Sequence, residues 1–103
     1  SVVVKRGTVF AVEGAEGTSA AIRRGGELGG AGTVVVKVSK PQQDLRFDVP
    51  AIGPETIAVM HEVGTAVLAI EAHKTLMIER EALLTKANKV SIRVVAVSVN
   101  SDR

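Results

Sequence analysis

The chain contains no cysteine, tyrosine or tryptophan, and its only aromatic side chains are Phe10 and Phe47. Without cysteine it can form neither disulfides nor thiolate metal sites, although this does not define its compartment. Proteins that bind single-stranded nucleic acid stack bases on aromatic side chains, which are almost missing here. The net charge of +2 also gives only a weak field at physiological salt. We therefore expect no nucleic-acid partner.

Long apolar runs are also missing, because no stretch approaches the ~20 residues of a transmembrane helix. The first residues, Ser1 to Lys5, read as a strand and not as a secretion signal. A chain that starts inside structure suggests a piece of something longer. Its 103 residues, 46% of them apolar, suffice for one folded domain with one core.

The hydrophobic pattern predicts strands and helices in the order β-β-α-β-α-β-β-α-β. The predicted strands cover residues 2–5, 8–13, 33–38, 66–70, 75–78 and 91–97, and the predicted helices begin at residues 20, 54 and 80. This order predicts a single α/β domain with a mixed β-sheet and about three helices packed on it.

Glycines crowd residues 25–32, between the first predicted helix and the strand that follows. A phosphate-binding P-loop follows a strand, opens a helix and carries Gly-Lys-Ser/Thr. Here the order is reversed, so we interpret this stretch as a helix C-cap and a loop that binds no phosphate.

Charge and proline are densest in residues 37–56, where Asp44, Arg46 and Asp48 alternate with apolar residues. On an extended backbone these three polar side chains share one face and the apolar ones line the other. Asp44 and Asp48 are then about 13 Å apart, so a site for one ion needs a bend or a third ligand. The alternative interpretation is a solvated edge strand with an internal Asp–Arg pair, ended by Pro50.

Polar side chains collect at the predicted ends of strands, where ligands of open α/β sheets tend to bind. Carboxylates interleaved with lysine and arginine suit a phosphate ester held with Mg²⁺, since carboxylates bind the hard cation and the basic groups bind phosphate oxygens. Pro54 is suited to the first position of a helix, whose free N–H groups point back toward the charged segment. His61 and His73 have no partner at ligand spacing, so we expect no zinc site.

Four stretches, in order, resemble the C-terminal domain of the bacterial UDP-2,3-diacylglucosamine pyrophosphatase family. They are residues 12–18, with Glu16-Gly17-Thr18; 40–50, which begin at Lys40-Pro41 and end at Pro50; 52–56, with Gly53-Pro54; and 69–76, with Glu71 and Lys74. The resemblance implies a two-domain enzyme of lipid A biosynthesis with its active site between the domains. It also implies Mg²⁺-dependent cleavage of UDP-2,3-diacylglucosamine to UMP and 2,3-diacylglucosamine 1-phosphate.

By this resemblance Asp44 and Asp48 are the catalytic candidates and, with Glu16, the metal-ligand candidates. The substrate-binding candidates are Thr18, Lys37, Lys40, Gln43, Arg46 and Lys74. The implied partners are the UDP-linked acylated glucosamine substrate, the missing N-terminal domain and a second copy in a homodimer. The implied location is the cytoplasm, with peripheral contact with the inner membrane.

The chain departs from the family pattern at several positions. Ser19 stands where the family continues Glu-Gly-Thr with Asp, so a metal ligand is lost there. Gln42 and His73 stand where glycine is usual, and Ala51 where threonine is common. Two other functions therefore stay open: a non-catalytic module that binds a nucleotide or phospholipid headgroup, and a structural domain whose exposed edge pairs two subunits.

Overall fold

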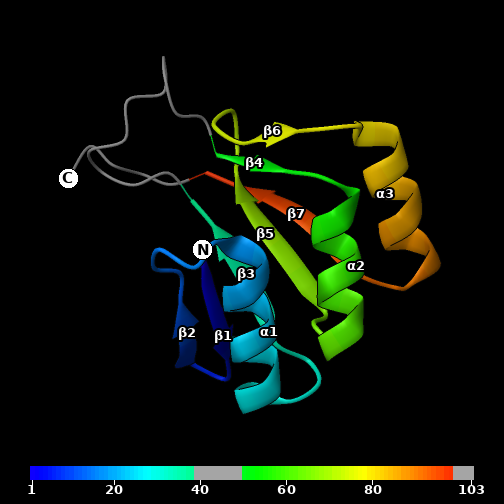
Figure 1. The fold of residues 1–103 in the computed structure, drawn as a ribbon. Coiled ribbons are helices and arrows are strands. Elements are labelled where there is room, and N and C mark those ends of the chain that lie inside the picture. The colour runs from blue at the N-terminus through cyan, green and yellow to red at the C-terminus, as the bar shows by residue number, and fades with distance from the viewer. Residues whose placement is uncertain (39–49, 99–103) are drawn as a thin grey trace.

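The structure is a computed structural model that describes residues 1–38 and 50–98 (Figure 1). Strands β1 (Val2–Lys5) and β2 (Thr8–Val12), both predicted as strands, pair antiparallel in a hairpin. The turn between them holds Arg6 at φ 51° and Gly7 at φ 77°. Two central residues with positive φ form the turn whose twist suits a two-residue hairpin.

The main sheet has five strands in the order β2-β1-β3-β5-β7. Its later strands are β3 (Val34–Lys37), β5 (Val67–Glu71) and β7 (Arg93–Val97). These three run parallel to one another, whereas β1 is antiparallel to both β2 and β3. The mixed sheet was predicted, and the strand predicted over residues 33–38 is the middle strand, β3.

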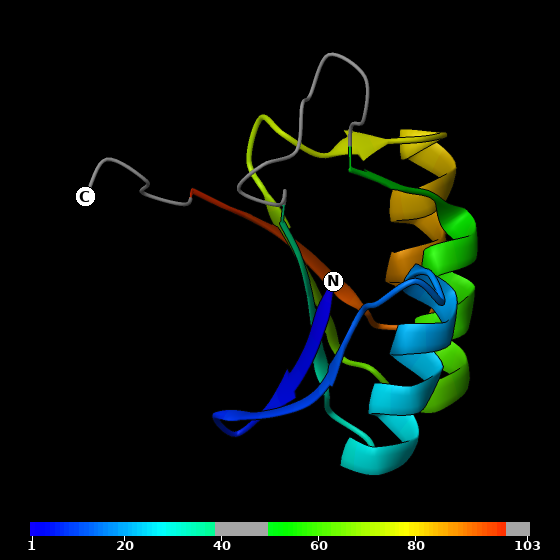
Figure 2. The same ribbon diagram turned by 60° about the vertical axis from the view of Figure 1, so that its left-hand side comes forward.

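Three helices pack on this sheet: α1 (Thr18–Gly29), α2 (Pro54–Val63) and α3 (Arg80–Lys89). The predicted starts of α2 and α3, at residues 54 and 80, are confirmed. All three helices lie on the same face of the sheet, as Figure 2 shows. The core between the two layers includes Val3, Ile22, Val35, Ile57, Met60, Leu68 and Leu83, each 0% exposed. None of the described helices is long and apolar enough to span a membrane.

A second, two-stranded parallel sheet pairs β4 (Ala51–Ile52) with β6 (Leu76–Met77). The strand predicted over residues 75–78 therefore exists but lies outside the main sheet. Strand β4 was not predicted, because two residues after Pro50 carry no periodicity of their own.

The prediction that residues 25–32 form a loop was wrong for its first half, because α1 continues through Gly25 and Gly26 to Gly29. A Cβ atom on Gly25 would lie 2.5 Å from Cβ of Val3, and one on Gly26 would lie 2.5 Å from Cβ of Val63. These glycines let α1 approach the sheet and α2 closely. Packing thus outweighs the poor helix propensity of glycine.

Candidate active site

The C-terminal ends of the parallel strands and the first turns of the helices lie together along one edge of the domain, the upper edge in Figure 1. Strand β3 ends here at Lys37, β5 ends at Glu71, and α1 begins at Thr18. We call this the carboxyl edge. It is the position at which open α/β sheets bind their ligands.

A chain of hydrogen bonds joins β3 to the start of α1. The Nζ atom of Lys37 donates to Oγ1 of Thr18 at 3.0 Å, and the Thr18 hydroxyl donates to Oε1 of Glu13 at 3.1 Å. An ammonium cannot accept a hydrogen bond, so the hydroxyl proton must point at the carboxylate. Two predicted substrate contacts, Lys37 and Thr18, are therefore brought together, and the chemistry of the ammonium makes Lys37 the donor.

Glu13 anchors this chain as a carboxylate. Partial burial by itself acts to raise its pKa, but hydrogen bonds from the backbone nitrogen of Ser1 and from Thr18 outweigh the burial and lower the pKa below its usual value. The nitrogen of Ser1 lies 3.1 Å from Oε1 of Glu13. Glu13 was named among the polar groups at strand ends, but nothing in its sequence context indicated that it would hold Thr18.

The first turn of α1 is electrostatically uncompensated. Its N-cap is Gly17, at φ 92°, which offers no side-chain cap, and the first turn contains no acidic residue. The N–H groups of such a turn and the helix dipole favour an anion. Ser19, where the resemblance implies Asp, lies in this turn. The Lys37 ammonium beside this turn makes it a site for a negatively charged group.

Glu16, a predicted metal ligand, is held within its own loop. Its Oε1 atom accepts hydrogen bonds from the backbone N–H of Gly14 and from Arg24, both at 2.9 Å. These bonds, the backbone bond foremost, lower the pKa of Glu16 below its usual value. Arg24 also donates to the carbonyl oxygen of Val12 at 3.0 Å, so the loop is tied to the end of β2.

Lys74 lies in the turn that follows β5, at the same edge. Its Nζ atom is 3.5 Å from Oε2 of Glu71, whose side chain is 6% exposed. The turn is strained at His73, which has φ 65°. The resemblance to the family implies glycine at position 73, and glycine is the residue that adopts this left-handed conformation without strain.

The other predicted site residues fall in a part of the chain that the structure does not describe: Lys40, Gln43, Asp44, Arg46 and Asp48. Within residues 1–38 and 50–98, no group of three or more acidic or histidine side chains is arranged to hold a metal ion. The roles of these five residues therefore stay predictions.

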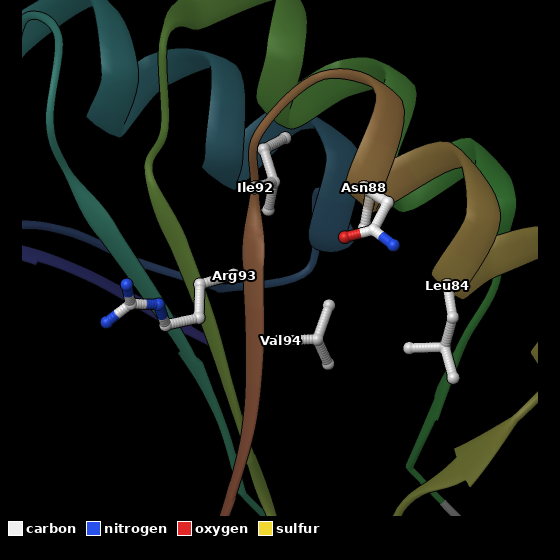
Figure 3. Close-up of a pocket in the computed structure, with 6 residues that line it drawn as sticks. Leu84, Asn88, Ile92, Arg93 and Val94 are labelled. Atoms are coloured by element: carbon white, nitrogen blue, oxygen red, sulfur yellow. The ribbon is translucent and has the colours of Figure 1, made fainter.

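Several cavities flank the part of the domain that the structure describes. One, of about 320 Å³, lies at the start of α2 beside Gly53, Pro54 and Glu79. Another, of about 280 Å³, lies between α3 and β7 and is shown in Figure 3. In that view Arg93 leaves β7 on the side opposite Val94 and Leu84. The lining of this cavity combines the apolar Leu84, Ile92 and Val94 with the polar Asn88 and Arg93.

Comparison with known proteins agrees with the resemblance read from the sequence. Residues 1–95 match the family model described as the LpxI C-terminal domain. The UDP-2,3-diacylglucosamine pyrophosphatase LpxI of Caulobacter vibrioides is 37% identical over 103 residues. The match covers 92% of this chain but only 37% of that relative, so the chain spans a little over a third of the relative's length.

Proposed function

The chain belongs to the LpxI C-terminal domain family, and we propose that it serves as one domain of an enzyme that hydrolyses the pyrophosphate bond of UDP-2,3-diacylglucosamine. The products are UMP and 2,3-diacylglucosamine 1-phosphate, in the biosynthesis of lipid A. The Caulobacter relative is a UDP-2,3-diacylglucosamine pyrophosphatase by name. An N-terminal domain, which this chain does not contain, completes the enzyme in this proposal.

The observation that carries the proposal is the position of Lys37 beside the uncapped first turn of α1. A pyrophosphate diester is an anion, and its hydrolysis builds up negative charge on phosphate oxygens. Preorganised donors aimed at that charge are the usual source of its stabilisation. An ammonium and the amide groups of one helical turn, at the carboxyl edge of the sheet, are donors of this kind.

Lys37 and Thr18 have different roles in this proposal. The Thr18 hydroxyl gives its proton to Glu13, so it is not available to donate to a phosphate. It accepts one of the three N–H groups of Lys37 and leaves two for phosphate oxygens. Thr18 and Glu13 are therefore positioning residues, and Lys37 and the α1 amides bind the substrate. Lys74, at the end of the neighbouring parallel strand, extends the cationic edge.

In this proposal Asp44, Asp48 and Glu16 are the ligands of Mg²⁺. A bound Mg²⁺ ion neutralises charge on phosphate oxygens and orients them. Glu16 already accepts hydrogen bonds from Arg24 and Gly14, so the described residues do not form a magnesium site by themselves. The assignment therefore depends on the two aspartates.

The second candidate function is a module that binds a nucleotide or phospholipid headgroup without cleaving it. The serine at position 19 favours it, because the family has a carboxylate in this first turn of α1. Such a module keeps the Lys37 anion site and lacks turnover even when the other domain is present. Cytoplasmic location and peripheral contact with the inner membrane, where an acylated substrate resides, fit both functions.

The test is UMP release from UDP-2,3-diacylglucosamine, measured with Mg²⁺ and with EDTA. We expect the isolated chain to show little or no turnover, because a site between two domains needs its second wall to exclude water. Combining the chain with the missing domain should raise the rate far above that of either part. Full turnover by the isolated chain would contradict the two-domain site, and substrate binding without turnover by the combined domains would favour the binding module.

A further inference from the structure

Arg24 lies on α1 and bonds to two points of the chain that precede this helix. Its Nη2 atom donates to the carbonyl oxygen of Val12, at the end of β2, at 3.0 Å. The same atom donates to Oε1 of Glu16 at 2.9 Å. Both hydrogens of this nitrogen are therefore used, and the two bonds hold the guanidinium in one orientation. Arg24 thus ties β2 and the loop over residues 13–17 to the helix whose first turn belongs to the anion site.

Two carboxylates lie close to this anion site. Oε1 of Glu13 accepts the hydroxyl proton of Thr18 at 3.1 Å, and Nζ of Lys37 lies 3.0 Å from the same hydroxyl oxygen. Glu16 precedes Thr18 by two residues, so their Cα atoms lie at most about 7.6 Å apart. That distance is within the screening length of about 8 Å at physiological salt. Both glutamates carry a negative charge at neutral pH, so both act on an anion bound here.

The charges at the start of α1 do not favour an anion unless Arg24 is included. Glu13, Glu16 and Lys37 together carry one net negative charge, which repels a phosphate. The guanidinium of Arg24 brings the sum to zero. The N–H groups of the first turn, which contains no acidic residue, then attract the anion through the positive end of the helix dipole.

We propose that Arg24 is a positioning residue for the anion site: it holds the Glu16 carboxylate in the loop and compensates its charge. In this role Arg24 acts through Glu16 and not through contact with the anion. The inference rests on the proposed function, since it concerns the same anion site. The side chains of Arg24 and Glu16 are 44% and 35% exposed, and exposed ion pairs stabilise a fold only weakly. Loss of the pair should therefore affect the site more than the fold.

Arg23, the neighbouring residue on α1, provides a matched control. Its Nε atom donates to Oε2 of Glu62 at 2.8 Å, and its side chain is 47% exposed, close to the value for Arg24. Glu62 lies in α2 and not in the loop before α1. Arg23→Gln and Arg24→Gln thus remove the same overall charge and each break one exposed ion pair, but only Arg24→Gln leaves Glu16 without its cation.

Calorimetric titration of the chain with inorganic pyrophosphate, in EDTA to exclude metal ions, tests this role. Arg24→Gln should weaken binding roughly three- to tenfold, the order of effect of one unit charge at about 8 Å near a protein surface. Arg23→Gln should bind as tightly as wild type. The double variant Glu16→Gln/Arg24→Gln should recover the wild-type affinity, because the second change removes the charge that the first leaves uncompensated. Glutamine keeps an oxygen that accepts from the N–H of Gly14, so the loop retains that bond.

The double variant separates charge compensation from other roles of Arg24. Affinity that is lost in Arg24→Gln and not recovered in the double variant would mean that Arg24 contacts the anion or acts on the loop by shape alone, and would overturn the proposal. Equal losses in Arg23→Gln and Arg24→Gln would overturn it too, because overall charge would then explain both. Unchanged binding by Arg24→Gln would remove the role of Arg24 and leave the proposed function intact. No binding by the wild-type chain would instead remove the Lys37 anion site itself.

Circular dichroism establishes whether each variant is folded. If Arg24→Gln does not fold, Arg24→Lys takes its place in the test. Lysine keeps the positive charge beside Glu16, so Arg24→Lys should retain the wild-type affinity for pyrophosphate. A folded Arg24→Lys that binds as weakly as Lys37→Met would contradict the proposed charge compensation.

Discussion

The ammonium of Lys37 lies 3.0 Å from the hydroxyl oxygen of Thr18, although 19 positions separate the two residues in the chain. This contact ties the end of the central strand to the first turn of α1. It places a fixed positive charge beside a helix N-terminus that has neither a side-chain cap nor an acidic residue. The anion site of the proposed function consists of this contact and the amides next to it.

Replacing Lys37 by methionine should weaken binding of inorganic pyrophosphate to the chain by roughly ten- to a hundred-fold, the usual range for losing a hydrogen bond from a charged group. The measurement is an NMR titration of the backbone amides in the first turn of α1. Lys5→Met is the matched control. Lys5 binds the opposite end of α1 by donating to the carbonyl oxygen of Gly29 at 3.0 Å.

The control should lose stability without losing affinity. A cation at a helix C-terminus contributes about 0.3–1 kcal/mol to stability, so Lys5→Met should lower the free energy of unfolding by about that amount. Equal loss of pyrophosphate affinity in both variants would mean that the anion binds through overall charge and not at the start of α1.

Gly25→Ala should destabilise the domain by about 1–3 kcal/mol, the usual cost of forcing extra atoms into a packed core. The new Cβ atom would lie 2.5 Å from Cβ of Val3, which belongs to the sheet and cannot rotate away. Urea unfolding measures the change. Gly14→Ala is the control, since its Cβ atom would meet only Glu16 Oε1, at an ordinary 3.6 Å. Equal stability of Gly25→Ala and wild type would mean that α1 shifts away from the sheet at little cost.

Much of the fold could be predicted because its signals are local. Pro54 predicted the start of α2, and the strand predicted over residues 33–38 corresponds to the central strand β3. The continuation of α1 through Gly25 could not be predicted. Glycine normally ends a helix, and here the reason for its presence is contact with Val3, whose distance depends on the tertiary structure.

His73→Gly should stabilise the chain by about 0.5–1 kcal/mol. The left-handed conformation at φ 65° costs a non-glycine residue about 1–2 kcal/mol, and the greater backbone freedom of glycine offsets part of that gain. His61→Gly is the matched control, because His61 is an exposed helical residue of α2. It should lose stability by about the helix-propensity difference, below 1 kcal/mol. Thermal unfolding gives both values, and a destabilised His73→Gly would show that the imidazole makes contacts worth more than the strain.

The lowered pKa of Glu16 predicts that the stability of the domain depends on pH. Its pKa is lowered in the folded chain by hydrogen bonds from Gly14 and Arg24, so its contribution is present above the unfolded pKa and is lost as the pH falls through the folded pKa. Glu16→Gln should therefore be less stable than wild type at pH 7 and equally stable in acid, once the pH is below the lowered pKa of Glu16 in the folded chain. Glu27→Gln, an exposed glutamate farther along α1, is the control and should follow the wild-type curve. A gap between Glu16→Gln and wild type that persists in acid would contradict the ionic origin.

The candidate site could be predicted only in part. The resemblance identified Thr18 and Lys37 separately, and the structure shows that they are in contact. The role of Glu13 depends on how the loop before α1 folds back, which no periodic pattern indicates. Glu16 was assigned to metal by its motif, whereas its hydrogen bonds to Gly14 and Arg24 arise from the loop geometry.

The most direct test of the central claim is UMP release from UDP-2,3-diacylglucosamine with Mg²⁺ by the two-domain enzyme that contains this chain. Asp44→Ala and Asp48→Ala should each reduce the rate by orders of magnitude without unfolding the domain, because they remove carboxylates assigned to the metal and the attacking water. Glu27→Ala, on the exposed surface of α1, should retain the wild-type rate. A two-domain enzyme that remains fully active with either aspartate replaced would contradict the account.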